Sequence, residues 1–284
     1  MSLPGTDRSA ATDAVVAPRP PGYVAPDPER VERAAGALLD SELEPIVDLV
    51  VTTDEEGYDV RAVDGRVQFR REPDGAGWRF VEAAVEGRNP LGDTATDRFP
   101  TLADELAARW PSRREQSYPH AYEHIAQLFD HPAAPDLVCL HTAAHNWEDQ
   151  GGERGEHGSL GVVQVRAPFL LAGAGVRRQG LVPRSCRLVD VAPTVLALLG
   201  AEPTAGAGPT GAPLDGALLA RQDGRVLTDL LDGTVPDHVV GFLWDGTNPT
   251  CSTTWWRPAR RPTWPACWPW APAWVTAPWP RCRR

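Results

Sequence analysis

The chain has 284 residues, an apolar fraction of 42% and a formal net charge of -10. This length and apolar content suffice for one large α/β domain or two small ones. The acidic balance argues against general nucleic-acid binding, because nucleic-acid-binding proteins neutralise phosphates with a basic face. All 28 residues counted as lysine or arginine are arginine, a composition typical of a GC-rich coding sequence.

The cysteines and the first residues bear on where the protein works. Five cysteines without regular spacing indicate neither a disulfide framework nor a zinc ribbon. Cys139 and Cys186 lie in apolar surroundings and are predicted to be buried free thiols, as in a reducing compartment. Residues 1–25 are rich in proline and alanine and lack an apolar signal core or a membrane-spanning run. We therefore expect a flexible leader at 1–25, a cytoplasmic location and no membrane partner.

The first half of the chain shows both periodicities of regular structure. Apolar positions at helical spacing predict a helix over Pro28–Leu43. Residues Pro45–Arg71 then alternate between apolar and polar, and glycines punctuate them, which predicts a small antiparallel sheet. Two further helices are expected over Leu102–Arg109 and Tyr118–Phe129.

Short apolar runs mark the second half. Asp136–His141 has the pattern of a buried parallel strand, and Ala167–Ala172 is a second such run, closed by a Gly173–Gly175 turn. A helix is expected from Asp190, as its N-cap, to a C-cap at Gly200.

A glycine- and proline-rich stretch follows, and we expect 205–236 to be a linker. His238–Trp244 is a third apolar run, predicted to be a strand. Strands that alternate with helices indicate an α/β layered sheet.

A histidine between glycines marks the first segment with candidate chemistry, Gly155–Leu160 (GEHGSL). His157 lies in a polar loop just before an apolar run, and ligands usually bind at such strand edges. Its imidazole is suited to be a neutral metal ligand, since the glycines let the backbone pack close to an ion. The alternative is a loop histidine without a role, which the residues alone favour, because one histidine does not make a site.

An aspartate follows the third apolar run. Asp245 stands directly after Trp244, a common position for a metal-binding carboxylate in open α/β sheets. The alternative is an aspartate that caps a helix or forms an Asp-Gly turn with Gly246. The residues favour neither interpretation over the other.

The stretch Gly155–Gly200 combines three motifs in one order: GEHGSL, RAPFLLAGAGV and LVDVAPTVLALLG. It resembles the C-terminal part of the catalytic domain in type I phosphodiesterase/nucleotide pyrophosphatase members of the alkaline phosphatase superfamily. Upstream, Gly87–Gly92 and Pro135–Val138 resemble actinobacterial members of this family. The resemblance implies an α/β fold, a partial alkaline phosphatase-like layered sheet with flanking helices and a small antiparallel sheet.

The resemblance also implies a zinc centre. His157 matches the histidine that completes the first zinc site in the family. Asp245 matches an aspartate ligand of the second, because FLWDGTNP resembles the opening strand of the domain. In the family that strand precedes the HGS segment, so the order here implies a permuted domain. We expect a domain at 26–204 with its opening strand at 237–249, and at most partial sites for the two zinc ions of the family.

Other candidate ligands match the family less well. His141 and His145 have metal-like spacing, but no Asp-His-Gly motif surrounds them, so we expect a structural or supporting role. Asp190 matches a family position, although a helix cap explains it. An acidic loop that we expect to be solvated holds Asp149, Glu153 and Glu156.

The segment 250–284 has neither aspartate nor glutamate and holds seven of the 11 tryptophans. It has no hydrophobic period and is interrupted by proline, so it cannot form the amphipathic helix of a tryptophan–arginine membrane anchor. Translating GC-rich DNA out of frame gives this composition. We expect an aberrant, unstructured tail produced by a frameshift near Pro249, because the shifted frame of a plausible back-translation continues as a family-like helix region.

The family reaction needs two metal ions and a serine or threonine nucleophile. No residue of this sequence matches the nucleophile. The resemblance therefore implies a metal-dependent phosphoric ester hydrolase for a small phosphoester substrate, in an incomplete and inactive chain. The alternative is a non-catalytic pseudoenzyme or binding module that retains the fold. The substrate, the metal and the oligomeric state stay open.

Overall fold

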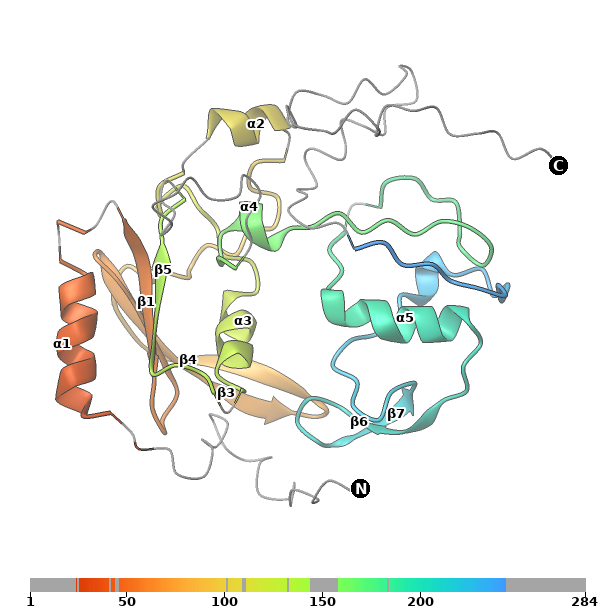
Figure 1. The fold of residues 1–284 in the computed structure, drawn as a ribbon, viewed down its shortest axis with the longest axis horizontal. Coiled ribbons are helices and arrows are strands. Elements are labelled where there is room, and N and C mark those ends of the chain that lie inside the picture. The colour runs from red at the N-terminus through yellow and green to blue at the C-terminus, as the bar shows by residue number, and fades with distance from the viewer. Residues whose placement is uncertain are drawn as a thin grey trace.

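A computed structural model describes residues 24–143 and 158–243, except residues 25, 41, 44, 45, 101, 109, 110, 132 and 183. Its main element is a five-stranded antiparallel sheet with the strand order β4-β3-β2-β1-β5. The strands are β1 (Val47–Thr53), β2 (Tyr58–Ala62), β3 (Gly65–Asp74), β4 (Gly77–Gly87) and β5 (Leu137–His141). Helices α1 (Pro28–Leu38) and α3 (Ala121–Leu128) lie on opposite sides of this sheet (Figure 1).

Strand β1 is buried on both faces. Val47 and Val50 pack against α1, whereas Leu49 and Val51 belong to the core below α3. Strict alternation would put positions 47 and 50 on opposite faces. A register shift between Val47 and Leu49, where β1 pairs with β5, brings them to the same face. Burial on both faces explains why β1 departs from strict alternation and carries consecutive apolar residues at positions 49–51.

Aromatic side chains join α3 to the sheet. The ring of Phe69 stacks on Tyr58 at a centroid distance of 4.8 Å and meets Tyr122 edge-on at 4.7 Å. Phe129, directly after α3, approaches Tyr58 at 6.1 Å. Such pairs stabilise a core beyond the area that they bury. The helix and the antiparallel sheet predicted in this region are confirmed, and the sheet extends on to Gly87.

Strand β5 corrects one prediction. The run at 136–141 was expected to be a buried parallel strand, but β5 pairs antiparallel with β1 at the edge of the sheet and is only half-buried. An apolar run indicates a strand, but it carries no information about the direction of the neighbour. Cys139 in β5 and Cys186 are free, as predicted, and both are half-buried.

The remaining elements are short. They are α2 (Leu102–Ala107), α4 (Val162–Val165), the 3-10 helix η1 (Leu188–Asp190), α5 (Val191–Leu198), β6 (Thr204–Ala207), β7 (Pro213–Ala217) and the 3-10 helix η2 (Thr228–Leu230). The helix predicted up to Gly200 is confirmed as α5. Gly200 ends it at φ +71°, and the N–H of Ala201 donates to the carbonyl of Leu196, as in a Schellman motif.

The stretch 205–236 is not the linker that its composition predicted. Strands β6 and β7 pair antiparallel within it, and η2 follows. Its glycines build the connecting turn, where the N–H of Gly208 donates to Ala212 and Gly211 adopts φ +83°. Glycine and proline here specify a tight turn and not a flexible chain.

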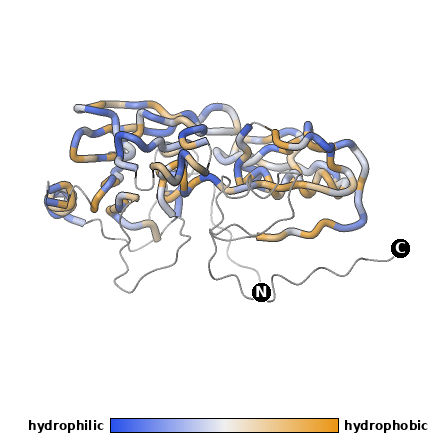
Figure 2. Tube along the Cα trace, turned by 90° about the horizontal axis from the view of Figure 1, so that it is seen from above, coloured by the Kyte–Doolittle hydropathy of each residue, from blue (hydrophilic) through white to orange (hydrophobic). Residues whose placement is uncertain are grey.

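Two predicted strands are absent from the described chain. Residues 167–172 and 238–243 form no strand. Leu170 is 72% exposed and Phe242 is 92% exposed. Figure 2 shows the second stretch running along the outside of the half that contains α5, β6 and β7. No helix of the described residues is long and apolar enough to span a bilayer.

Candidate functional site

The two predicted metal ligands, His157 and Asp245, lie outside the described residues, as do His145 and the acidic loop of Asp149, Glu153 and Glu156. The backbone directly after the histidine is described. Gly158 adopts φ +105°, a conformation that side chains rarely allow, and the hydroxyl of Ser159 accepts from the N–H of Gly161 just before α4.

His141, the remaining histidine of the metal-like pair, ends β5. Its Nδ1 lies 2.9 Å from the carbonyl oxygen of Thr142. Within the part of the chain that the structure describes, no three His, Cys, Asp or Glu side chains come together as a metal ion would require. The zinc centre implied by the resemblance therefore stays a prediction that depends on His157 and Asp245.

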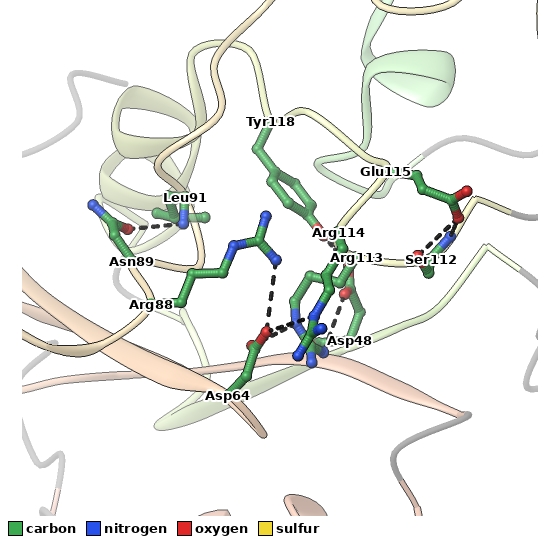
Figure 3. Close-up of polar contacts among 10 residues, drawn as sticks. All are labelled: Asp48, Asp64, Arg88, Asn89, Leu91, Ser112, Arg113, Arg114, Glu115 and Tyr118. Atoms are coloured by element: carbon green, nitrogen blue, oxygen red, sulfur yellow. Dashed lines mark hydrogen bonds and ion pairs between the residues drawn. The ribbon is translucent and has the colours of Figure 1, made fainter.

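The most elaborate polar site among the described residues is a network around Asp48 of β1 (Figure 3). Tyr118, just before α3, donates its hydroxyl to Asp48 Oδ2 at 2.8 Å. Arg113 donates from Nη1 to the backbone oxygen of Asp48 at 3.1 Å and from Nε to Asp64 Oδ1 at 3.1 Å. These three contacts fix the loop 111–118 against β1 and the β2–β3 turn.

Burial of the Asp48 carboxylate costs free energy, because the group loses its contact with water. Only 6% of the residue is exposed, and Oδ1 has no hydrogen-bond partner among the described residues. Burial raises the pKa of Asp48, although the Tyr118 hydrogen bond and the Arg113 charge oppose the rise. Burial and the neighbouring carboxylate also raise the pKa of Tyr118 far above its ordinary range, so the phenol stays a donor.

Asp64, in the β2–β3 turn, forms ion pairs with three arginines. Arg113 contacts it from one side, Arg114 Nε lies 3.4 Å from Oδ2, and Arg88 Nη1 lies 3.6 Å from Oδ2. Burial alone would raise the pKa of Asp64, but the charge and the hydrogen bond of Arg113 outweigh it, and the pKa is lowered. This arrangement stabilises a loop and offers no open nucleophile or base.

A second buried carboxylate ties α5 to the segment after β7. Asp190 was predicted to cap the helix, but its side chain makes no cap hydrogen bond to α5. Its two oxygens accept instead from the N–H groups of Arg187 and Arg225, each at 2.9 Å. Thr194 extends the contact, because its hydroxyl donates to the Asp190 carbonyl and accepts from the N–H of Leu227.

These contacts explain two residues of the LVDVAPT motif in local terms. Asp190 is 2% exposed and Thr194 is 1% exposed, and together they join three chain segments by hydrogen bonds. Asp190 belongs to no group of three candidate metal ligands within the described chain. The motif therefore has a structural role here, whatever the role of the loop that precedes it.

Comparison of the chain with protein-family models, with curated proteins and with solved structures gives no match.

Proposed function

We propose that this chain is an incomplete member of the metal-dependent phosphoric ester hydrolases, of the type I phosphodiesterase/nucleotide pyrophosphatase kind in the alkaline phosphatase superfamily. The proposal rests first on the ordered motifs between Gly155 and Gly200. Its substrate class is a small phosphoester. The free thiols of Cys139 and Cys186 support a reducing, cytoplasmic location.

The observation that carries the proposal furthest is the position of two apolar stretches. Residues 167–172 belong to the family-like motifs, and 238–243 lead directly to Asp245. Leu170, Phe242 and Leu243 are 72%, 92% and 95% exposed. Apolar runs of this kind normally lie in the buried strands of an α/β sheet, and large exposed apolar surface signals a missing contact. This exposure supports a catalytic domain that lacks the elements to cover it.

The chain just after the first stretch is hydrogen-bonded to the chain that precedes the second, which supports a permuted domain. Gly175, in the GAGV turn, accepts from the N–H of Asp232, and the N–H of Arg177 donates to Leu230. A side chain at Gly175 would place Cβ 2.3 Å from the Thr234 carbonyl, so only glycine permits this approach. Residues 230–234, which precede the second apolar stretch, therefore lie against the GAGV turn.

In this proposal His157 would hold the first zinc ion and Asp245 the second. Zinc, when bound, supplies a Lewis acid for the phosphoryl oxygens and lowers the pKa of the nucleophile. No residue of the sequence matches the nucleophile of the family, and neither ion has a full ligand set. The chain is accordingly expected to be inactive.

We expect no measurable hydrolysis of p-nitrophenyl phosphate or bis-p-nitrophenyl phosphate by this chain with added zinc. The physical reason is the lack of a nucleophile held between two metal ions. Release of p-nitrophenol, followed by absorbance, measures the outcome. Zinc-dependent turnover that is lost on adding a chelator would show that the chain is a complete enzyme and contradict the proposal.

A non-catalytic pseudoenzyme or binding module is the second candidate. It is favoured by the lack of a three-residue metal-binding group in the described chain. The coding DNA separates the two candidates. An insertion or deletion near Pro249 supports a disrupted enzyme, whereas an intact frame supports a protein that functions without turnover.

A further inference from the structure

A cavity of about 370 Å³ lies between the β3–β4 turn, α3 and the segment 208–225. The hydroxyl of Thr210 donates to the Gly75 carbonyl at 3.1 Å and closes one end. Figure 1 shows the end of the β3–β4 hairpin reaching the β6–β7 region there. The volume lies at the lower end of the range for small-molecule sites.

The cavity is positively charged in a protein that is acidic overall. Four arginines and three carboxylates line it, against a net charge of -10 for the chain. The arginines are Arg71, Arg187, Arg221 and Arg225.

The three carboxylates are all engaged. Arg71 pairs with Asp130 at 2.5 Å, and Arg187 pairs with Glu123 at 2.5 Å. Arg221 holds Asp223 through two hydrogen bonds of 3.0 and 3.1 Å. Each carboxylate neutralises the charge of one arginine, so the fourth arginine carries the uncompensated charge of the cavity.

That fourth arginine, Arg225, is exposed, and its guanidinium makes no ion pair or hydrogen bond within the described residues. Its backbone is nevertheless fixed, because its N–H donates to the buried carboxylate of Asp190. The preceding Gly224 is packed so closely that a Cβ would lie 2.1 Å from the Val189 carbonyl. A free cation on a fixed backbone is a preorganised anion contact.

Inside the cavity, Arg71 gives a second reason to expect a bound ligand with hydrogen-bond acceptors. The residue is 5% exposed, and its Nε has no hydrogen-bond partner among the described residues. An unsatisfied charged donor costs free energy when buried. Its guanidinium lies 4.4 Å over the ring of Trp78, and Phe80 and Leu214 continue the apolar wall.

We infer that this cavity binds a small aromatic oxyanion, such as an aryl carboxylate or an aryl phosphate monoester. The oxyanion pairs with Arg225, because guanidinium presents paired donors that match carboxylate and phosphate oxygens. The aromatic body lies against Trp78 and Phe80. The site requires no metal, so its test is independent of the test of the proposed hydrolase function.

Isothermal titration calorimetry in the presence of a chelator tests the inference with phenyl phosphate, benzoate and phenol as probes. We expect both anions to bind and phenol to bind at least about tenfold more weakly, since a charge-assisted contact is lost. Tighter binding of phenyl phosphate would assign the site to phosphate monoesters, and tighter binding of benzoate to carboxylates. Absence of binding by both anions at millimolar concentration would overturn the inference.

The variant Arg225→Ala is expected to weaken anion binding about tenfold or more and to leave phenol unchanged. Arg178→Ala is the matched control, because Arg178 is also exposed, has no ion pair among the described residues and lies outside the cavity. Arg225→Gln and the cavity-filling Leu214→Trp give independent readings if the alanine variant folds poorly. Wild-type affinity in all three cavity variants would refute the inference.

Discussion

Replacing Arg113 with alanine is expected to lower the free energy of unfolding by about 3–5 kcal/mol, as for the loss of one partner of a buried ion pair. Arg113 is 8% exposed, and its guanidinium serves both Asp48 and Asp64. Its removal leaves the Asp48 carboxylate buried, with the Tyr118 hydroxyl as its remaining hydrogen-bond donor among the described residues. Urea denaturation followed by circular dichroism measures the change.

The effect of this substitution should depend on pH with a defined sign. Without Arg113 the pKa of folded Asp48 rises further, so the folded variant binds a proton more readily than its unfolded chain and regains stability as the pH falls. Asp64 acts in the same direction, because the stability that its lowered pKa provides is lost in the wild type at low pH. The difference between the two proteins is therefore largest at neutral pH and shrinks as the pH falls towards about 4 and below.

Arg114→Ala is the matched control. Arg114 is the next residue and contacts the same carboxylate, but its side chain is 76% exposed. An exposed ion pair contributes at most about 1 kcal/mol. Equal losses for the two arginines, or a loss at Arg113 that does not change with pH, would contradict the network described for Asp48.

Replacing Asp190 with alanine is expected to cost about 3 kcal/mol, because two N–H groups lose a charged acceptor. The Asp190 side chain joins η1 to the segment that leads to Leu227 by accepting one hydrogen bond from each side. Asp190 is 2% exposed. Thermal unfolding of the variant measures the loss, and a lowered melting temperature is the expected result.

Asp229→Ala provides the comparison for this second substitution. Asp229 also pairs with an arginine, Arg184, at 2.7 Å, but it is 52% exposed. Its loss should cost less than about 1 kcal/mol. If Asp190→Ala were no more harmful than Asp229→Ala, the stabilising role assigned to the two buried Asp190 hydrogen bonds would be contradicted.

Local patterns in the sequence predicted much of the fold around the sheet. The alternation at 45–71 predicted β1 to β3, and the helical spacing at 118–129 predicted α3. Both predictions are confirmed, because the side chains that create the patterns form the core. The direction of β5 was not predictable, because strand pairing depends on residues distant in the chain. The apolar runs at 167–172 and 238–243 predicted strands that need partners, and the described chain supplies none.

The polar sites were harder to foresee. Asp48 stands between apolar residues. A carboxylate in such a position indicates a buried partner, because buried charges are normally paired. That partner, Arg113, is 65 residues away in the chain. Arg225 carries no local motif, and its significance arises from Asp190, which fixes its backbone. The predicted ligands His157 and Asp245 stay predictions outside the described residues.

Zinc-dependent hydrolysis by the frame-restored protein is the decisive measurement for the proposed hydrolase function. The chain would be expressed with the alternative reading frame from Pro249, and p-nitrophenol release from bis-p-nitrophenyl phosphate would be followed with zinc and with a chelator. We expect zinc-dependent turnover that falls to background in His157→Ala and persists in His131→Ala, which replaces an exposed histidine. No turnover with zinc or manganese, or full turnover without His157, would contradict it.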